Sequence, residues 1–373
     1  MPAERTDAGD EPPLRVALVL PESSGGIGTH CRMLAASLAG RGDEVTVLAP
    51  RATLARFDFA GVVARTVAVD AAAPGVLRRS RRLRSLIAGL DVVHAHGVRV
   101  GALVSLARPE SLLRPESLQP VPLVATWHNA PLGGVVRRSA HVALERASAR
   151  AAAVVLAASA DLLERARRAG ARDARFCPVP APSLAGVVVR GEGEPKPLTL
   201  LAVARLHRQK RLDLLVDATA GWADRPDAPR VLVAGDGPER DRLRAHAARV
   251  RSPVQLLGAR DDVADLLAHA TLVVLPSDWE ARPLVAQEAL RAGVPLIATA
   301  VGGVPGLVGD AAVLVPPGDT DALSAAIERV LADSALRRRL AVAGPAQAAR
   351  WPGEEEMTTL VRQVYLDVRS RVS

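Results

Sequence analysis

The chain has 373 residues, of which 49% are hydrophobic and 2% aromatic, and its 48 Lys and Arg residues against 40 Asp and Glu residues give a net charge of +8. Single cores rarely grow beyond roughly 250–300 residues, so two domains are expected. The basic excess favours phosphate-bearing ligands or an anionic membrane face, whereas the scarcity of aromatic side chains argues against base stacking, so we expect no nucleic-acid partner.

The N-terminal residues 1–13 are polar and acidic, which predicts a disordered tail rather than a signal peptide. Cys31 and Cys177 are the only cysteines, too few for a disulfide framework or a metal site, and they fit a reducing cytosol. No run approaches 18 apolar residues, so no membrane span is expected. These features predict a cytoplasmic protein.

The first half opens with a βαβ pattern that is typical of a doubly wound parallel sheet. A buried strand over 15–21 precedes a glycine turn, a helix over 29–39 and a strand over 44–49. The turn reads Gly-Gly-x-Gly, out of pattern for a dinucleotide site. Gly26 within it lets the backbone approach a ligand, although tight-turn geometry alone also explains it. Further strands are predicted over residues 62–69, 91–94, 123–127 and 153–157.

Two of these strands run into a histidine. His96 ends the sequence VVHAH and His128 ends LVATWH. Ligands of open α/β sheets bind beyond the carboxyl ends of the strands, so both histidines are candidate site residues. A histidine at such a place also caps a strand or bonds a loop carbonyl, and we regard His128 as the stronger candidate of the two.

A basic segment follows the third predicted strand. Five arginines fall within seven residues, flanked by apolar side chains at helical spacing: Arg78, Arg79, Arg81, Arg82 and Arg84. Such an amphipathic helix can lie on an anionic membrane surface. A solvated arginine face is the alternative, and the arginine-rich composition favours it.

The clearest change in amino-acid composition along the chain is the Pro- and Gly-rich stretch from 178 to 197. It predicts a first domain over 14–184, a linker over 185–197 and a second domain over 198–350. Strands and helices alternate again in the second domain, which indicates a second parallel sheet. A last helix is expected within 351–373.

Three loops of the second domain are predicted to share one edge of that sheet. Arg205 follows a strand and Lys210 precedes the next helix, and two such cations suit a diphosphate. Gly235 and Gly258 each follow a strand of their own. Ordinary βα connections contain such residues too, and only their joint occurrence at one edge favours a ligand site.

The second domain is organised around Glu280 and Glu288, eight residues apart across a loop-to-helix junction. The helix is predicted to begin at Pro283, so the N–H groups of Leu284 and Val285 lie at its N-terminus, where anions are favoured. A carboxylate on each side of that terminus suits a sugar nucleotide, which has hydroxyls at both ends and negative charge between them. Surface helices carry such glutamate pairs as well.

Taken together, these motifs resemble those of the family-4 glycosyltransferases, retaining enzymes with the GT-B architecture. The resemblance runs from residue 15 to about residue 331 and rests on an ordered set of matches. The family's Glu-x7-Glu signature matches Glu280 and Glu288, its Arg-Leu-x-x-x-Lys segment matches Arg205 to Lys210, and its Gly-Asp-Gly-Pro turn begins at Gly235. The amino-terminal glycine loop and the Thr-x-His that ends in His128 match too.

The resemblance implies an α/β fold with two Rossmann-like, doubly wound parallel-sheet domains that face each other across a cleft, and a C-terminal helix that packs back on the first domain. It implies a diphosphate held by the following residues: Arg205, Lys210, Leu284, Val285 and Gly26. Glu288 would hold the ribose, and Glu280 the hydroxyls of the transferred sugar. His128 would lie at the reacting face. His128 and Glu280 are the expected catalytic residues. We place Arg282, Gly235 and Gly258 near the donor sugar or base.

One stretch departs from the family. Where relatives read Glu-Gly-Phe-Gly-Leu, this chain has Ala281, Arg282 and Pro283 between Glu280 and Leu284. Proline has no N–H, so a backbone donor available to relatives is missing, and the sugar readout is expected to differ.

The resemblance predicts a retaining, metal-independent transferase without cofactor. Its donor would be a UDP- or GDP-sugar, and its acceptor a hydroxyl of a lipid or cell-envelope glycan precursor. The basic helix predicts peripheral contact with the inner face of the membrane. A nucleotide-sugar 2-epimerase of the same fold and a non-catalytic nucleotide-sugar binding protein are the alternatives, and a dinucleotide oxidoreductase is a distant third.

Overall fold

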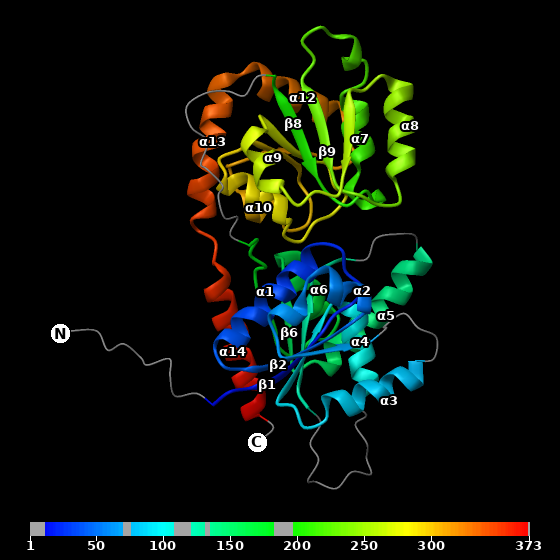
Figure 1. Cartoon of the computed structure of the whole chain (residues 1–373), viewed down its shortest axis with the longest axis vertical. Coiled ribbons are helices and arrows are strands. Elements are labelled where there is room, and N and C mark those ends of the chain that lie inside the picture. Colours follow the sequence, from blue (N-terminus) through cyan, green and yellow to red (C-terminus); the bar gives the residue numbers. More distant parts are fainter. Residues whose placement is uncertain (1–11, 70–75, 108–120, 131–134, 183–196, 372–373) are drawn as a thin grey trace, which may run out of the picture.

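The computed structural model describes residues 12–69, 76–107, 121–130, 135–182 and 197–371, and it consists of two α/β domains stacked end to end (Figure 1). The predicted tail up to residue 11 and the predicted linker up to residue 196 lie outside the described residues. No helix of the described part is long and apolar enough to span a bilayer.

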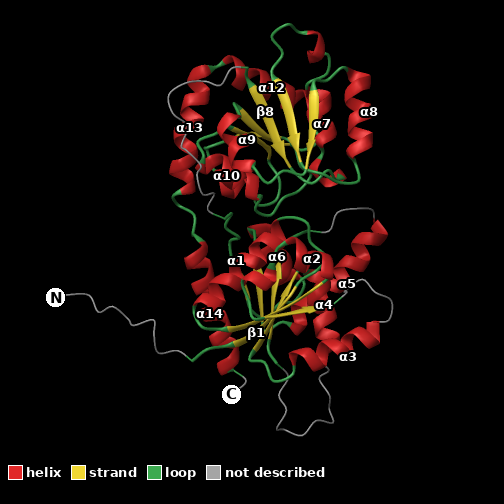
Figure 2. Ribbon diagram, in the orientation of Figure 1, coloured by secondary structure: helices red, strands yellow, loops and turns green. Residues whose placement is uncertain are grey.

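The first domain is a parallel sheet with helices on both faces (Figure 2). Its strands lie in the order β3-β2-β1-β4-β5-β6-β7. The strands are β1 (Arg15–Val19), β2 (Glu44–Ala49), β3 (Arg65–Ala68), β4 (Val92–His96), β5 (Leu123–Trp127), β6 (Val154–Ala157) and β7 (Ala174–Phe176). The helices are α1 (Gly26–Gly40), α2 (Arg51–Arg56), α3 (Val76–Ile87), α4 (Val98–Ala107), α5 (Val135–Ala151) and α6 (Ala160–Arg168), with a 3₁₀ turn η1 (Phe59–Gly61).

The second domain repeats the architecture with the strand order β10-β9-β8-β11-β12-β13. The strands are β8 (Thr199–Val203), β9 (Arg230–Ala234), β10 (Val254–Gly258), β11 (Leu272–Leu275), β12 (Leu296–Thr299) and β13 (Val313–Val315). The helices are α7 (Leu212–Ala218), α8 (Arg240–Val250), α9 (Val263–His269), α10 (Leu284–Arg291), α11 (Val304–Val308), α12 (Thr320–Ala332) and α13 (Ser334–Ala348), with 3₁₀ turns η2 (Arg208–Lys210) and η3 (Trp222–Asp224). A last helix, α14 (Glu354–Ser370), follows the second domain in the chain.

Both sheets are buried on both faces, which explains why their strands read as continuous apolar runs. In β1, Val16 and Leu18 belong to one core cluster, and Ala17 and Val19 to the cluster on the opposite face. The alternation follows from the two-residue period of a strand. The two parallel sheets confirm the predicted fold class.

Two local predictions differ from the structure. The strand predicted over 62–69 is only β3, because the 3₁₀ turn η1 occupies its approach and Asp58 before that turn has a left-handed φ of 44°. Pro283 was expected to be the first residue of its helix, but it caps α10 from outside with ψ of 128°. Leu284 therefore becomes the first helical residue.

The last helix joins the two domains. After α13 the chain leaves the second domain, and α14 runs down beside α1 of the first (Figure 1). Arg362 of α14 lies 3.1 Å from the fully buried carboxylate of Asp43, and the Tyr365 hydroxyl lies 2.6 Å from Nδ1 of His94. The C-terminal residues thus complete the core of the first domain.

The other crossing between the domains, just before the linker, is held by α10. The side chain of Gln287 donates to the carbonyl of Val179 at 3.1 Å and accepts from the N–H of Ala181 at 2.9 Å. Arg291 donates to the carbonyl of Ala181 at 2.6 Å. The same helix that begins at the predicted donor site therefore contacts the segment that connects the domains.

Candidate functional site

The loops that follow the strands of the two sheets meet between the domains. The indole Nε1 of Trp279, after β11, donates to Asp161 at the start of α6 over 2.9 Å. A Cβ placed on Gly26 at the start of α1 would lie 3.6 Å from the side chain of Leu284, the first residue of α10. The carboxyl ends of both sheets therefore contribute to one region, as the resemblance implied.

Glu280 is the most constrained carboxylate of this region. It is buried, and its Oε1 accepts from Lys210 Nζ at 2.5 Å and from the Ser277 hydroxyl at 2.7 Å. Lys210 ends the η2 turn, seventy residues earlier in the chain. The structure thus brings two predicted ligand groups of opposite charge into direct contact.

Three further predicted groups flank this pair. Arg205 is exposed after β8, and no ion pair involves it among the described side chains. The N–H groups of Leu284 and Val285 open α10, whose cap residue Pro283 supplies no side-chain partner. Free N–H groups at a helix start attract anions, so a cation and a positive helix end are both available here.

Gly235 and Gly258 have a positioning role. The N–H of Gly235 donates to the carbonyl of Gly258 at 2.7 Å. Gly235 has a φ of +142°, and a Cβ on it would come within 1.9 Å of the carbonyl oxygen of Ala204. Only glycine lets β9 approach so closely the loop that carries Arg205.

Glu288 and Arg291 lie one turn apart on α10. Burial raises the pKa of Glu288 to about 6, and the nearby Arg291 opposes that shift only in part. A carboxylate held in such surroundings gains from hydroxyl donors that stabilise its charge. The ribose diol expected from the resemblance supplies such donors.

The Arg282 side chain packs against Trp351, which lies between α13 and α14. Its guanidinium stacks 5.3 Å from the ring centre of Trp351, and Arg291 stacks on the same ring at 6.0 Å. Burial lowers the pKa of Arg282 to about 10. Its Nε and Nη2 atoms have no hydrogen-bond partner among the residues that the structure describes. Its expected contact with the donor sugar or base stays a prediction.

His128 belongs to a group of buried histidines in the first domain. Its Nε2 lies 3.1 Å from Nδ1 of His96, and the ring of His30 from α1 lies edge-on, 5.4 Å from that of His128. One ring nitrogen from each of these three histidines lies within 4.8 Å of the other two. Burial lowers the pKa of all three, so they are neutral at pH 7.

The sequence offered no separate signal for His30, for the Ser277 hydroxyl or for the contact between Trp279 and Asp161. His30 lies on a helix whose facing strands cannot be known without the fold. His94 was also missed, and both of its ring nitrogens are bonded, to Tyr365 and to Thr126 at 2.6 Å each.

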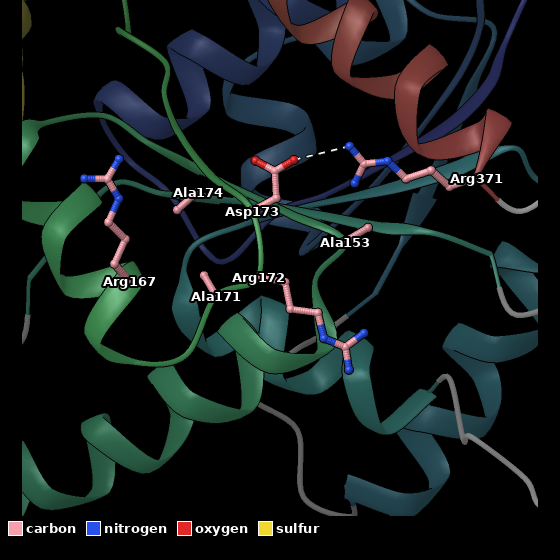
Figure 3. Close-up of a pocket in the computed structure, with 7 residues that line it drawn as sticks. All are labelled: Ala153, Arg167, Ala171, Arg172, Asp173, Ala174 and Arg371. Atoms are coloured by element: carbon pink, nitrogen blue, oxygen red, sulfur yellow. Dashed lines mark hydrogen bonds and ion pairs between the residues drawn. The ribbon is translucent and has the colours of Figure 1, made fainter.

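A hollow of about 620 Å³ lies in the first domain, beside the starts of β6 and β7 (Figure 3). Asp173 in it already pairs with Arg175 and Arg371. The guanidinium groups of Arg167 and Arg172 point away from each other (Figure 3). The arrangement does not converge on one ligand, and we assign no function to it.

Comparison with known proteins agrees with this geometry. Residues 25–182 match the model of the glycosyl transferase 4-like domain, and residues 190–347 match that of glycosyl transferases group 1. A phosphatidyl-myo-inositol mannosyltransferase of Mycobacterium leprae is 28% identical over 94% of this chain and 96% of its own. Matches to three other curated relatives, at 31–38% identity, span only 16%, 45% and 41% of those proteins.

Solved structures show the same fold. Sucrose-phosphate synthase from Thermosynechococcus elongatus superposes with a TM-score of 0.78 at 21% identity, covering 96% of this chain and 100% of that one. HepE from Anabaena, solved in complex with UDP and glucose, gives 0.74 at 19% identity, covering 94% and 99%. With both family models matched in order and both domains built as in these structures, the chain belongs to the family-4 glycosyltransferases of the GT-B fold.

Proposed function

We propose that this protein transfers a sugar from a UDP- or GDP-sugar to a hydroxyl acceptor, with retention of anomeric configuration and without a metal or other cofactor. The observation that carries the proposal is the start of α10, where Glu280 and Lys210 meet beside free helix N–H groups and Glu288 follows about one turn on. The relative HepE, whose structure holds UDP and glucose, supports a nucleotide donor.

The donor diphosphate would lie between the two helix starts. Arg205, Lys210 and the N–H groups of Leu284 and Val285 approach it from the second domain, and the backbone at Gly26 approaches it from the first. A diphosphate anion attracts the ammonium group of Lys210, which without donor neutralises Glu280. Donor binding would thereby release the Glu280 carboxylate for the hydroxyls of the sugar.

The charge that develops on the departing diphosphate would be stabilised by these groups. Two side-chain cations and a positive helix end in a partly buried site can supply the electrostatic stabilisation of the leaving group. Attack by the acceptor on the same face of the sugar would retain the configuration, and the leaving phosphate would take the acceptor's proton. Neutral His128, at the end of β5, would accept or donate a hydrogen bond at this face.

The acceptor is proposed to be a lipid or a cell-envelope glycan precursor, used at the inner face of the membrane. The mannosyltransferase relative, named for a phosphatidyl-inositol, supports this class of acceptor. In α3 the side chains of Arg81, Arg82 and Arg84 are exposed while Leu83 and Ile87 are buried in the core. The side chains of Arg78 and Arg79 lie outside the described residues.

Thermal-shift measurements with UDP, GDP and their sugar derivatives test donor binding, since a ligand that binds only the folded state stabilises it. We expect one nucleotide series to raise Tm in the wild type and in Arg208→Gln, whose guanidinium is exposed and pairs with Glu239. Lys210→Gln should lose most of that shift. An equal shift in Lys210→Gln, or no shift with any sugar nucleotide, would contradict the proposal.

Turnover separates the proposal from its alternatives. A transferase consumes the bound donor only together with an acceptor, apart from slow hydrolysis, and the product keeps the anomeric configuration of the donor. Epimerised donor sugar without an acceptor would indicate the 2-epimerase. Tight binding of the donor without turnover would indicate a binding protein. In that case the activity of the protein in the producing cell would also be unchanged by His128→Ala and Glu280→Gln.

A further inference from the structure

Three histidines from separate elements converge in the first domain. His30 comes from α1, His96 ends β4 and His128 follows β5. Each ring is at least nine-tenths buried, with 2%, 0% and 8% exposure respectively. Buried polar side chains normally have hydrogen-bond partners, so a cluster of three requires an explanation beyond packing.

Two of the ring nitrogens are unsatisfied. Nδ1 of His30 and Nε2 of His96 are buried and have no hydrogen-bond partner within the part of the chain that the structure describes. Nδ1 of His96 and Nε2 of His128 lie 3.1 Å apart, so one shared proton is the most that this contact can accommodate between two neutral rings. Each neutral ring carries one N–H and one lone pair. Within the described residues, a nitrogen of His30 and a nitrogen of His96 therefore stay unpaired in every combination of tautomers.

The spacing of the nitrogens fits a metal ion. Two imidazole nitrogens bound to one tetrahedral Zn²⁺ at about 2.0–2.1 Å lie about 3.3–3.4 Å apart. Nδ1 of His96 and Nε2 of His128, 3.1 Å apart, are already near that separation. One ring nitrogen of each of the three histidines lies within 4.8 Å of the other two. A small rotation of the His30 ring would complete a three-nitrogen set.

The chemistry of the donor set limits the ion. Three neutral imidazoles without a thiolate or carboxylate suit Zn²⁺, Co²⁺, Ni²⁺ or Cu²⁺ and not Mg²⁺ or Ca²⁺. His94, whose ring centre is 4.2 Å from that of His96, is excluded because both of its nitrogens are already bonded.

We propose that His30, His96 and His128 form a binding site for one divalent transition-metal ion, with the fourth coordination position left for water or an acceptor hydroxyl. The ion is not needed for transfer. It withdraws His128 from the reacting face, so Zn²⁺ acts as a reversible inhibitor. The binding site stands on its own geometry, whereas the inhibitory effect rests on the proposed function.

Cobalt titration of the metal-stripped, full-length protein tests the site. We expect one equivalent of Co²⁺ to bind and to give the visible absorption of a tetrahedral ion, unchanged in His269→Ala, which removes an exposed histidine of α9. His30→Gln and His96→Gln should each weaken Co²⁺ binding at least about tenfold, which is the lower limit even for residues that only support metal ligands. Absence of a saturable spectrum, or its persistence in both variants, would overturn the proposal.

A measurement without variants covers the case in which these substitutions prevent folding. X-ray absorption of the Zn²⁺-loaded wild type should report three imidazole ligands, and two or fewer would refute the site. Inhibition of transfer by Zn²⁺, reversed by EDTA, tests the consequence. Metal binding without inhibition would contradict the role of His128 in transfer and would leave the site intact, so the two failures are distinguishable.

Discussion

Glu288→Gln is expected to stabilise the protein at neutral pH while it weakens donor binding. Burial raises the pKa of Glu288 from 4.5 to about 6 in the folded state. Above pH 6 the carboxylate is ionised in both the folded and the unfolded state, so the full free-energy penalty of burying its charge destabilises the folded state. At about 1.4 kcal/mol per pH unit, that difference is about 2 kcal/mol.

The sign of the pH dependence follows from the direction of the shift. Below pH 4.5 the carboxyl group is protonated in the folded and unfolded states, and Glu288 carries no penalty. As the pH rises from 4.5 to about 6, the unfolded state loses its proton first, and the wild type loses stability relative to the glutamine variant. The difference in free energy of unfolding should therefore grow from near zero to about 2 kcal/mol and then stay level.

Urea denaturation of both proteins between pH 4 and 8 measures this difference. Glu328→Gln, which removes an exposed carboxylate from α12, is the matched control for the loss of one negative charge. Isothermal titration with the preferred nucleotide at pH 8 should show weaker binding for Glu288→Gln. A glutamine variant that is less stable at pH 8, or a difference that does not change with pH, would refute the reasoning.

Three other measurements probe the remaining features. Tyr365 is the only tyrosine of the chain, and burial raises its pKa well above 10. Phenolate absorption should therefore appear only together with unfolding at alkaline pH. Ionisation of the tyrosine before the loss of helical circular dichroism would contradict this expectation. Gly235→Ala, with its Cβ 1.9 Å from the Ala204 carbonyl oxygen, should cost about 1–3 kcal/mol in urea denaturation, whereas Gly306→Ala, with no atom within 4 Å of the added Cβ, should not destabilise. Trp279→Phe removes the hydrogen bond to Asp161 in the first domain and should raise the KM for the donor about tenfold, as a loss of about 1.4 kcal/mol implies. An unchanged KM would show that this bond does not favour closure.

The predictions that succeeded rest on local patterns. Continuous apolar strands and glycine turns indicate parallel sheets, because a strand that is buried on both faces is apolar at every position. Such a run can be recognised within a few consecutive residues. The order of the motifs then identified the family. The strand registers bring the end of β4 beside β5, with His96 opposite Thr126. Neighbouring strand ends were therefore predictable, and two histidines at one edge followed from them.

What the sequence did not show depends on contacts between distant segments. The pairing of Lys210 with Glu280 spans seventy residues, and each was expected only as a ligand for the donor. Arg282 stacks on Trp351, which lies about seventy residues later in the chain. His30 joins the other histidines only because α1 packs on that face of the sheet. No spacing rule relates such positions.

The helix α14 also has a consequence for the order in which the protein is made. The first domain leaves the ribosome with about half of the chain still to be synthesised, yet the residues that cover its core are among the last twenty. Until they arrive, the Asp43 carboxylate lacks its arginine and His94 lacks the tyrosine hydroxyl. A nascent first domain therefore has an uncovered apolar groove beside α1, where Met357, Val361 and Val364 will later pack. The apolar side chains that line it therefore stay uncovered by α14 until the second domain has been synthesised.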